Sequence, residues 1–172
     1  MVAPQRATLL SVLCLWSLLA IASSAQTEME RERNSLRNIE GFYLSLNVEG
    51  KRSVVEQDGL DFQTLHLRLR TRLQDTALPV LDETTVPAHE RVPYLHVHVN
   101  IMEADRGQLP FVVELRFYQS VRLIRDPAHT TVAGTWGTSL VGLTYAGQLQ
   151  FIEDTAVDLL TDFIDDFRQV NL

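Results

Sequence analysis

Two stretches of the chain alternate apolar and polar residues in the manner of half-buried β-strands. Apolar residues occupy every second position from Phe42 to Val48, and the same period of two runs from Tyr94 to Ile101. Successive side chains of a strand point to opposite faces, so each stretch predicts one face against a core and one facing outward. Asp105-Arg106-Gly107 then forms a turn into a partner strand that runs from Val113 to Leu123. This arrangement predicts a long antiparallel hairpin.

Apolar residues three to four positions apart predict two helices. In the first, this spacing covers Phe62 to Leu73, behind Asp58 or Asp61, either of which suits a helix N-cap. Residues 65–70 also fit a period of two, but Leu73 and the strong helix formers favour the helix over a strand. The second helix is C-terminal, and its apolar stripe consists of Leu149, Ile152, Ala156, Leu160, Phe163, Phe167 and Val170. We expect the acids opposite this stripe to be solvated: Asp154, Asp158, Asp162, Asp165 and Asp166.

The remaining segments connect these elements. Pro79 makes residues 78–81 an extended exit from the first helix, and two prolines make Thr84 to Pro93 a loop. After Asp126-Pro127 ends the hairpin strand, β-branched residues with two glycines predict a fourth strand over Thr130 to Thr138. The glycines suggest that this strand bends or approaches another surface closely.

The order strand, helix, strand, strand, strand, helix predicts an α+β fold. We expect a two-layer domain over residues 41–172, with a mostly antiparallel four-stranded sheet and two helices packed on one face. Residues 26–40 are polar and carry both signs of charge, so they predict a mobile or weakly helical lead-in that acts as a spacer.

Residues 1–25 have the features of a signal peptide. Arg6 precedes an uncharged apolar run, and Ser23-Ser24-Ala25 supplies the small residues that a signal peptidase requires, which predicts cleavage after Ala25. The run is shorter than the roughly 20 residues of a bilayer span, which disfavours an uncleaved anchor and predicts no stable membrane span after cleavage. Leu13 is too bulky a neighbour for lipid attachment at Cys14. We therefore expect a periplasmic or extracellular protein.

Composition restricts the chemistry of the exported domain. Cys14 is the only cysteine, so signal removal leaves neither a disulfide nor a thiol nucleophile, and stability must come from packing. The chain has 15 basic and 22 acidic residues, a net charge of −7, and loss of Arg6 makes it one unit more negative. Its densest basic run, Arg68, Arg70 and Arg72, is short and interrupted, and reads as the solvated side of one element. Nucleic acid is therefore not an expected partner.

Catalytic and metal signatures are weak. His96 and His98 project to one side of a strand and offer two metal ligands, but no spacing singles out Glu114 or His66 as a third. His89 and His129 lie in loops, Thr138-Ser139 lacks a nucleophile motif, and the C-terminal aspartates lack the glycine bend of a calcium loop. We therefore predict no enzyme activity, no catalytic residue, no metal site and no cofactor.

A sheet covered by helices on one face leaves the other face for a partner. The residues expected to form this candidate interaction surface are Tyr43, Tyr94, His96, His98, Arg116, Tyr118 and Trp136. Such a mixed polar and aromatic surface predicts a non-enzymatic periplasmic binding or assembly module that acts through the sheet face or a sheet edge. The alternative is a small-ligand or metal-binding protein that uses the His96 and His98 face.

The chain resembles a group of small exported bacterial proteins. The resemblance lies in Gly59 to Leu73, Leu78 to Asp82, Pro93 to Val97 and Leu159 to Asn171. It implies an exported α/β domain and attaches no activity to any of these motifs. The order of elements is also similar to two-layer envelope modules such as the lipopolysaccharide-transport lipoprotein partner and the regulators of penicillin-binding proteins, a similarity that concerns the fold alone.

Overall fold

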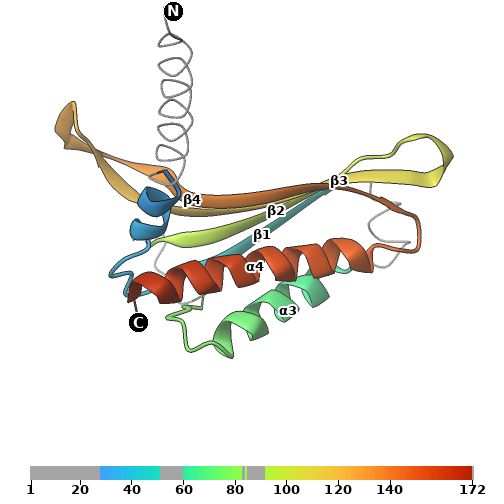
Figure 1. The fold of residues 1–172 in the computed structure, drawn as a ribbon, viewed down its shortest axis with the longest axis horizontal. Coiled ribbons are helices and arrows are strands. Elements are labelled where there is room, and N and C mark those ends of the chain that lie inside the picture. The colour runs from blue at the N-terminus through green and yellow to red at the C-terminus, as the bar shows by residue number, and fades with distance from the viewer. Residues whose placement is uncertain (1–27, 51–59, 83, 85–91, 172) are drawn as a thin grey trace, which may run out of the picture.

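The chain folds into a sheet layer and a helix layer. The computed structural model describes residues 28–50, 60–82, 84 and 92–171. A short helix over residues 28–34 precedes the main elements. These are β1 (Tyr43–Gly50), α3 (Phe62–Gln74), β2 (Tyr94–Ile101), the short 3-10 helix η2 (Asp105–Gly107), β3 (Gln108–Leu123), β4 (Asp126–Tyr145) and α4 (Gln150–Asn171). Figure 1 shows α3 and α4 packed side by side under one face of the sheet, which confirms the α+β prediction.

The four strands form one mixed sheet in the order β1-β2-β3-β4. β2 pairs with β3, and β3 with β4, in antiparallel fashion, whereas β1 and β2 are parallel. Two of the three pairings are antiparallel, as the prediction of a mostly antiparallel sheet requires, and the parallel pair makes the sheet mixed. The physical reason is the connection: α3 carries the chain back to the starting end of the sheet, so β2 runs in the same direction as β1.

The first helix begins at an acidic cap. The Asp61 carboxylate accepts hydrogen bonds from the Gln63 and Thr64 amides, at 3.1 and 3.2 Å, and from the Thr64 hydroxyl at 2.6 Å. The Thr64 hydroxyl is the largest cause of the lowered pKa of Asp61, since it stabilises the ionised form. Leu65, Leu69 and Leu73 are buried, so the helix prediction is confirmed over the strand alternative. Asp58, the other candidate cap, lies outside the described residues.

The hairpin of β2 and β3 is confirmed, and its turn uses left-handed backbone. Arg106 has φ 61° and Gly107 has φ 72°. The next hairpin differs from the prediction, because Asp126-Pro127 does not break the sheet. A two-residue turn at 124–125 leads directly into β4, which begins at Asp126. Pro127 is tolerated there because β4 is an edge strand.

Phenylalanine rings fill the space between sheet and helices. Phe42 contacts Phe117 and Phe163 edge to face, with ring centroids 5.6 and 5.5 Å apart. Six members of the predicted α4 stripe are buried, and Val170 is partly buried against the same core. Within residues 78–81, Val80 forms an isolated parallel β-bridge with Phe42, and the Phe42 amide donates to the Pro79 carbonyl at 3.1 Å. Most of the predicted loop from Thr84 to Pro93 lies outside the described residues.

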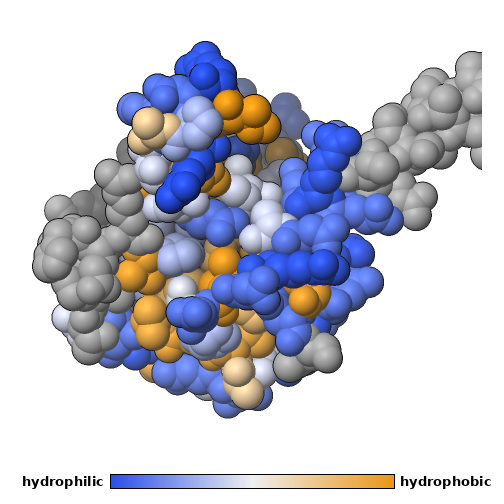
Figure 2. Space-filling model, turned by 90° about the vertical axis from the view of Figure 1, so that its left-hand side faces the viewer, coloured by the Kyte–Doolittle hydropathy of each residue, from blue (hydrophilic) through white to orange (hydrophobic). Residues whose placement is uncertain are grey.

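The described part of the lead-in is packed against the domain. Leu36 is fully buried. The Asn171 side chain donates to the Leu36 carbonyl and accepts from the Asn38 amide, both at 2.8 Å. Figure 2 looks onto the end of the molecule where these segments meet, and hydrophilic residues cover most of it with apolar ones between them. From residue 28 onward, the spacer prediction is therefore wrong.

Two arginines of the predicted basic run form ion pairs. Arg68 donates to Glu153 at 3.3 Å and Asp154 at 2.7 Å, which joins α3 to α4. Arg70 donates to Asp82 at 2.9 Å, and this hydrogen bond is the largest cause of the pKa of Asp82 falling to about 2. These side chains thus form ion pairs rather than simply facing solvent.

Within the described chain, no helix is long and apolar enough to cross a bilayer.

Candidate binding face

The face of the sheet opposite α3 and α4 gathers most of the predicted surface residues. We call it the open face and define it by the outward residues of β1, β2 and β3: Tyr43, Ser45, Asn47, Tyr94, His96, His98, Asn100, Glu114, Arg116 and Tyr118. The strands alternate, and the intervening side chains, such as Leu95 and Val97, are fully buried. Both long helices lie on the other side of the sheet (Figure 1).

Three tyrosines form a stacked row across the open face. Tyr43, Tyr94 and Tyr118 are direct neighbours in the strand register. The rings of Tyr43 and Tyr94 are 5.4 Å apart at 23°, and those of Tyr94 and Tyr118 are 5.0 Å apart at 17°. Cross-strand aromatic pairs of this kind each contribute about 0.5–1 kcal/mol. The row is therefore held in place by its own stacking and presents a fixed aromatic surface.

Two histidines continue this surface along β2. The rings of His96 and His98 lie 6.2 Å apart, nearly parallel at 28°. His96 Nδ1 lies 3.2 Å from the Ser45 hydroxyl, and His98 Nε2 lies 3.5 Å from a Glu49 carboxylate oxygen. Burial is the largest cause of the lowered pKa of His96, followed by the neighbouring His98, while Glu114 acts in the opposite direction. His96 is accordingly a neutral ring at physiological pH.

The geometry offers little support for a metal site. In the part of the chain that the structure describes, no group of three or more His, Cys, Asp or Glu side chains is placed to hold an ion. Glu114 is directly opposite His98 in the register, but its carboxylate accepts from Arg116 Nε at 2.6 Å. His66 stacks on Phe62 of α3, on the other side of the sheet, with ring centroids 6.2 Å apart. Neither candidate third ligand completes the histidine pair.

Ser45 and His96 are the one serine and histidine pair of the open face that meets within hydrogen-bonding distance. A nucleophilic serine needs a base oriented by a third group and an oxyanion site. Among the described residues, no carboxylate is hydrogen-bonded to His96, and its lowered pKa weakens it as a base. Ser139, from the predicted hydroxyl pair, lies on β4 opposite Glu114 rather than beside this histidine.

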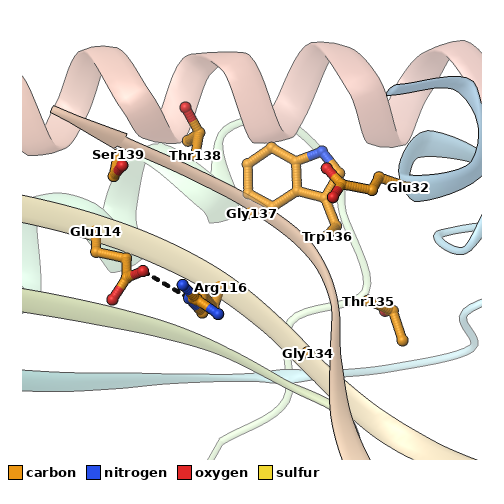
Figure 3. A pocket seen from close by; sticks show the side chains of 9 residues that line it. All are labelled: Glu32, Glu114, Arg116, Gly134, Thr135, Trp136, Gly137, Thr138 and Ser139. Carbon is orange, nitrogen blue, oxygen red and sulfur yellow. Dashed lines mark hydrogen bonds and ion pairs between the residues drawn. The ribbon is translucent and has the colours of Figure 1, made fainter. Parts of the chain in front are cut away.

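Arg116 lies above a floor made by glycine. A Cβ at Gly137 would lie 3.4 Å from Arg116 Cγ, and one at Gly134 would lie 3.6 Å from Tyr118 Cε1. The missing side chains leave a hollow of about 220 Å³, with Glu32 of the 28–34 helix at its rim (Figure 3). The hydrogen bond to Glu114 raises the pKa of Arg116, so the guanidinium stays charged. The absence of side chains at the two glycines thus leaves a shallow hollow on β4 beside the charged Arg116 guanidinium.

Trp136 lies on the opposite face from the one predicted. Thr135 is an extra residue in β4: Gly134 pairs with Tyr118, but Trp136 pairs with Phe117 instead of Arg116. This bulge turns the indole into the core, where it is 5% exposed and packs on Phe163 at 5.1 Å. Figure 3 shows the indole directed toward α4, away from Arg116. Trp136 is therefore not part of the open face.

One of the aspartates predicted to be solvated holds this region together. Asp166 accepts from Trp136 Nε1 at 2.9 Å and from Arg33 Nε at 2.6 Å. Beside it, the bulged Thr135 carbonyl accepts from the Ser35 hydroxyl at 3.1 Å, and Gln119 donates to the Ser35 carbonyl at 2.9 Å. These contacts attach the lead-in to β4 and α4, and the helical spacing that placed Asp166 with the other acids carried no sign of them.

The solved structures that match the chain include two bacterial proteins. No protein-family model matches the chain, and no curated protein matches it. A minor lipoprotein from Acinetobacter baumannii is 8% identical, with a TM-score of 0.31 over 78% of this chain and 92% of the lipoprotein. A neuraminyllactose-binding hemagglutinin homolog from Helicobacter pylori is 13% identical, with a TM-score of 0.29 over 74% of this chain and 82% of the homolog.

Proposed function

We propose that the chain is a non-enzymatic module of the cell envelope that binds a partner protein through the open face. The stacked row of Tyr43, Tyr94 and Tyr118, with Arg116 beside it, carries this proposal. Tyrosine and arginine are enriched at the centres of protein interfaces, because they bury a large area while keeping a polar group for hydrogen bonding. The stacked rings also lose little side-chain entropy on binding, since their neighbours already hold them.

The shape and charge of the open face favour a protein over a small ligand. Small-molecule sites are usually concavities of about 300–1,000 Å³. The hollow beside Arg116 is about 220 Å³, and the rest of the face is the surface of a sheet. The charge of Arg116 is balanced locally, since Arg116 is paired with Glu114. The matching partner is a segment that offers apolar groups to the rings and hydrogen-bond acceptors to the hydroxyls of Tyr94 and Tyr118.

The envelope location rests on residues 1–25, which lie outside the described residues. The small residues before Gln26 favour cleavage after Ala25. Intact-mass measurement of protein recovered from the native host tests this directly. A mass that corresponds to a chain beginning at Gln26 supports export. A mass that includes the first 22 residues, or acyl chains on Cys14, contradicts the assignment as a soluble periplasmic protein.

Site-specific photocrosslinking tests the binding face. Asn47 is exposed on the open face next to His98, and Asp158 is exposed on α4. A photoreactive phenylalanine analogue at position 47 should yield a discrete adduct in the native host, and the same analogue at position 158 should not. Tyr94→Ala in the position 47 background should weaken the adduct, because it removes the middle ring of the row. Equal adducts from both positions, or none from position 47 in folded protein, would contradict the proposal.

A metal or small ligand at His96 and His98 is the second candidate. Its support is the parallel placement of the two rings and the buried His98 Nε2, which has no hydrogen-bond partner among the described residues. Elemental analysis distinguishes the two functions. One zinc per purified chain, lost in the double variant His96→Ala with His98→Ala, would favour the metal site. A metal-free protein whose position 47 adduct weakens in the same double variant would favour the partner protein.

A further inference from the structure

The two halves of the edge strand β4 are built differently. The first half has the features by which proteins protect a sheet edge: Asp126, Pro127, the bulge at Thr135 and the Ser35 hydroxyl bonded to the Thr135 carbonyl. The second half, Gly137 to Tyr145, pairs with β3 in unbroken register. Among the described residues, its only other backbone hydrogen bond is at the last position, where the Gln148 amide donates to the Tyr145 carbonyl.

The second half of β4 also lacks charge. No Asp, Glu, Lys or Arg occurs between Asp126 and Glu153, in a chain of which 22% is charged. Charged side chains, prolines and bulges are the usual means of preventing a sheet edge from pairing with another chain. From Gly137 to Tyr145 none of the three is present.

Exposed apolar side chains border this edge on both faces of the sheet. Val141, Leu143 and Tyr145 are 76%, 50% and 48% exposed on the side of the open face. Leu140 and Phe151 are 39% and 53% exposed on the side of the helices. A strand added along this edge would cover apolar surface above and below while satisfying the outward backbone groups between them.

We infer that this edge pairs with the same edge of a second copy of the chain, in antiparallel fashion, to give a continuous eight-stranded sheet with a two-fold axis near Val141. A two-fold contact brings a segment against itself, so an acid at the axis would face an acid of the other copy, and an acid elsewhere in the segment would place two like charges in the same contact. In a chain of net charge −7, the neutral stretch of β4 avoids this repulsion. The free run is about nine residues, or roughly 30 Å of strand, with its midpoint at Val141.

The oligomeric state tests the inference with a matched pair of variants. Val141 and Val132 are both exposed on β4, at 76% and 48%, but only Val141 lies in the free run. At about 100 µM, light scattering should give the mass of a dimer if its Kd is well below that concentration. Val141→Glu should give the monomer mass, because two carboxylates would meet at the axis, and Val132→Glu should remain dimeric.

A monomer for the unmodified protein at that concentration would overturn the inference and assign the edge to a strand of another protein. An unchanged dimer in Val141→Glu, while the variant keeps its thermal unfolding midpoint, would also overturn it. Loss of the dimer in both variants would contradict pairing confined to the second half of β4.

Single cysteines test the register. In a Cys14→Ser background the chain has no other cysteine. In an antiparallel self-pairing, only residues at the axis face their own counterparts, and a disulfide needs Cβ atoms about 3.5–4.5 Å apart. Val141→Cys should therefore form a disulfide-linked dimer in much higher yield than Ser139→Cys or Leu143→Cys. Equal yields at the three positions would show an unspecific association and contradict the two-fold pairing.

Discussion

The covered and open faces of the sheet arise from the same strands and are held together by different means. On the covered face, Phe117 and Trp136 pack against Phe163 of α4. On the open face, Tyr118 stacks on Tyr94 of the neighbouring strand, and Arg116 pairs with Glu114 of its own strand. Stability should therefore depend on the covered face, while the open face can change with a small effect on folding. The first three predictions below each compare a pair of matched substitutions, and the fourth concerns the open face alone.

The largest expected effect is on the covered face of α4. Phe163 is fully buried and contacts four aromatic rings, whereas its neighbour Asp162 is exposed. Phe163→Ala should lower the free energy of unfolding by about 3–5 kcal/mol, because it removes a large ring and leaves a cavity. Asp162→Ala should change it by less than about 0.5 kcal/mol. Urea denaturation measures both, and equal effects would show that α4 does not cover the sheet.

Two glycines of β4 allow the same comparison within one strand. A Cβ at Gly142 would overlap the Phe111 ring in the core, while a Cβ at Gly134 would make ordinary contact with Tyr118. Gly142→Ala should cost about 1–3 kcal/mol by overpacking, and Gly134→Ala should cost much less. Thermal unfolding midpoints report the order. A larger loss at Gly134 would mean that the open face is the more tightly packed one.

Two adjacent aspartates of α4 test the polar contact at the edge of the core. Asp166→Ala removes the acceptor for both Trp136 and Arg33, and should cost about 1–2 kcal/mol because it leaves a largely buried indole N–H without its partner. Asp165 is exposed, so Asp165→Ala is the control. Chemical denaturation with tryptophan fluorescence follows both variants. If they behave alike, the bulge alone suffices to keep the indole in the core.

The smallest effect concerns the pH dependence from the open face. The pKa of His96 is lowered below its ordinary 6.5, mainly by burial. The unfolded chain therefore takes up the proton first, and folding stability falls as the pH drops from about 6.5 through the lowered pKa. His96→Gln should remove this part of the decline, as judged from urea denaturation at about pH 7.5 and about pH 5. An unchanged pH dependence would show that burial does not lower the pKa of His96 in the folded protein.

Local patterns were sufficient to predict much of the fold. The period of two in β2, the turn at Asp105–Gly107 and the Asp61 cap each involve residues close in sequence, and each appears in the structure as predicted. The apolar stripe of α4 is similarly local and predicts the buried side of the helix. The same alternation placed six of the seven candidate surface residues on the open face.

The predictions that failed depend on contacts distant in sequence. The sequence left the partner of β1 unassigned, and its parallel pairing with β2 depends on which sheet edge the chain reaches after α3, which no pattern within β1 specifies. The single extra residue at Thr135 reverses the side of Trp136, and period alone does not locate a bulge. Leu36 is a single apolar residue in a polar segment, and Asp166 is one of several acids on α4. The burial of the first and the hydrogen bonds of the second become visible only with their partners in place.

The hydrogen bond between Asn38 and Asn171 affects when the protein can finish folding. These residues are 133 positions apart, so at a synthesis rate of about 5–20 residues per second roughly 7–27 s separate their appearance. The sheet and α3 precede α4 in the sequence, so before α4 is made the apolar side of the sheet is covered by α3 alone. A nascent chain therefore stays incompletely folded until α4 has been synthesised.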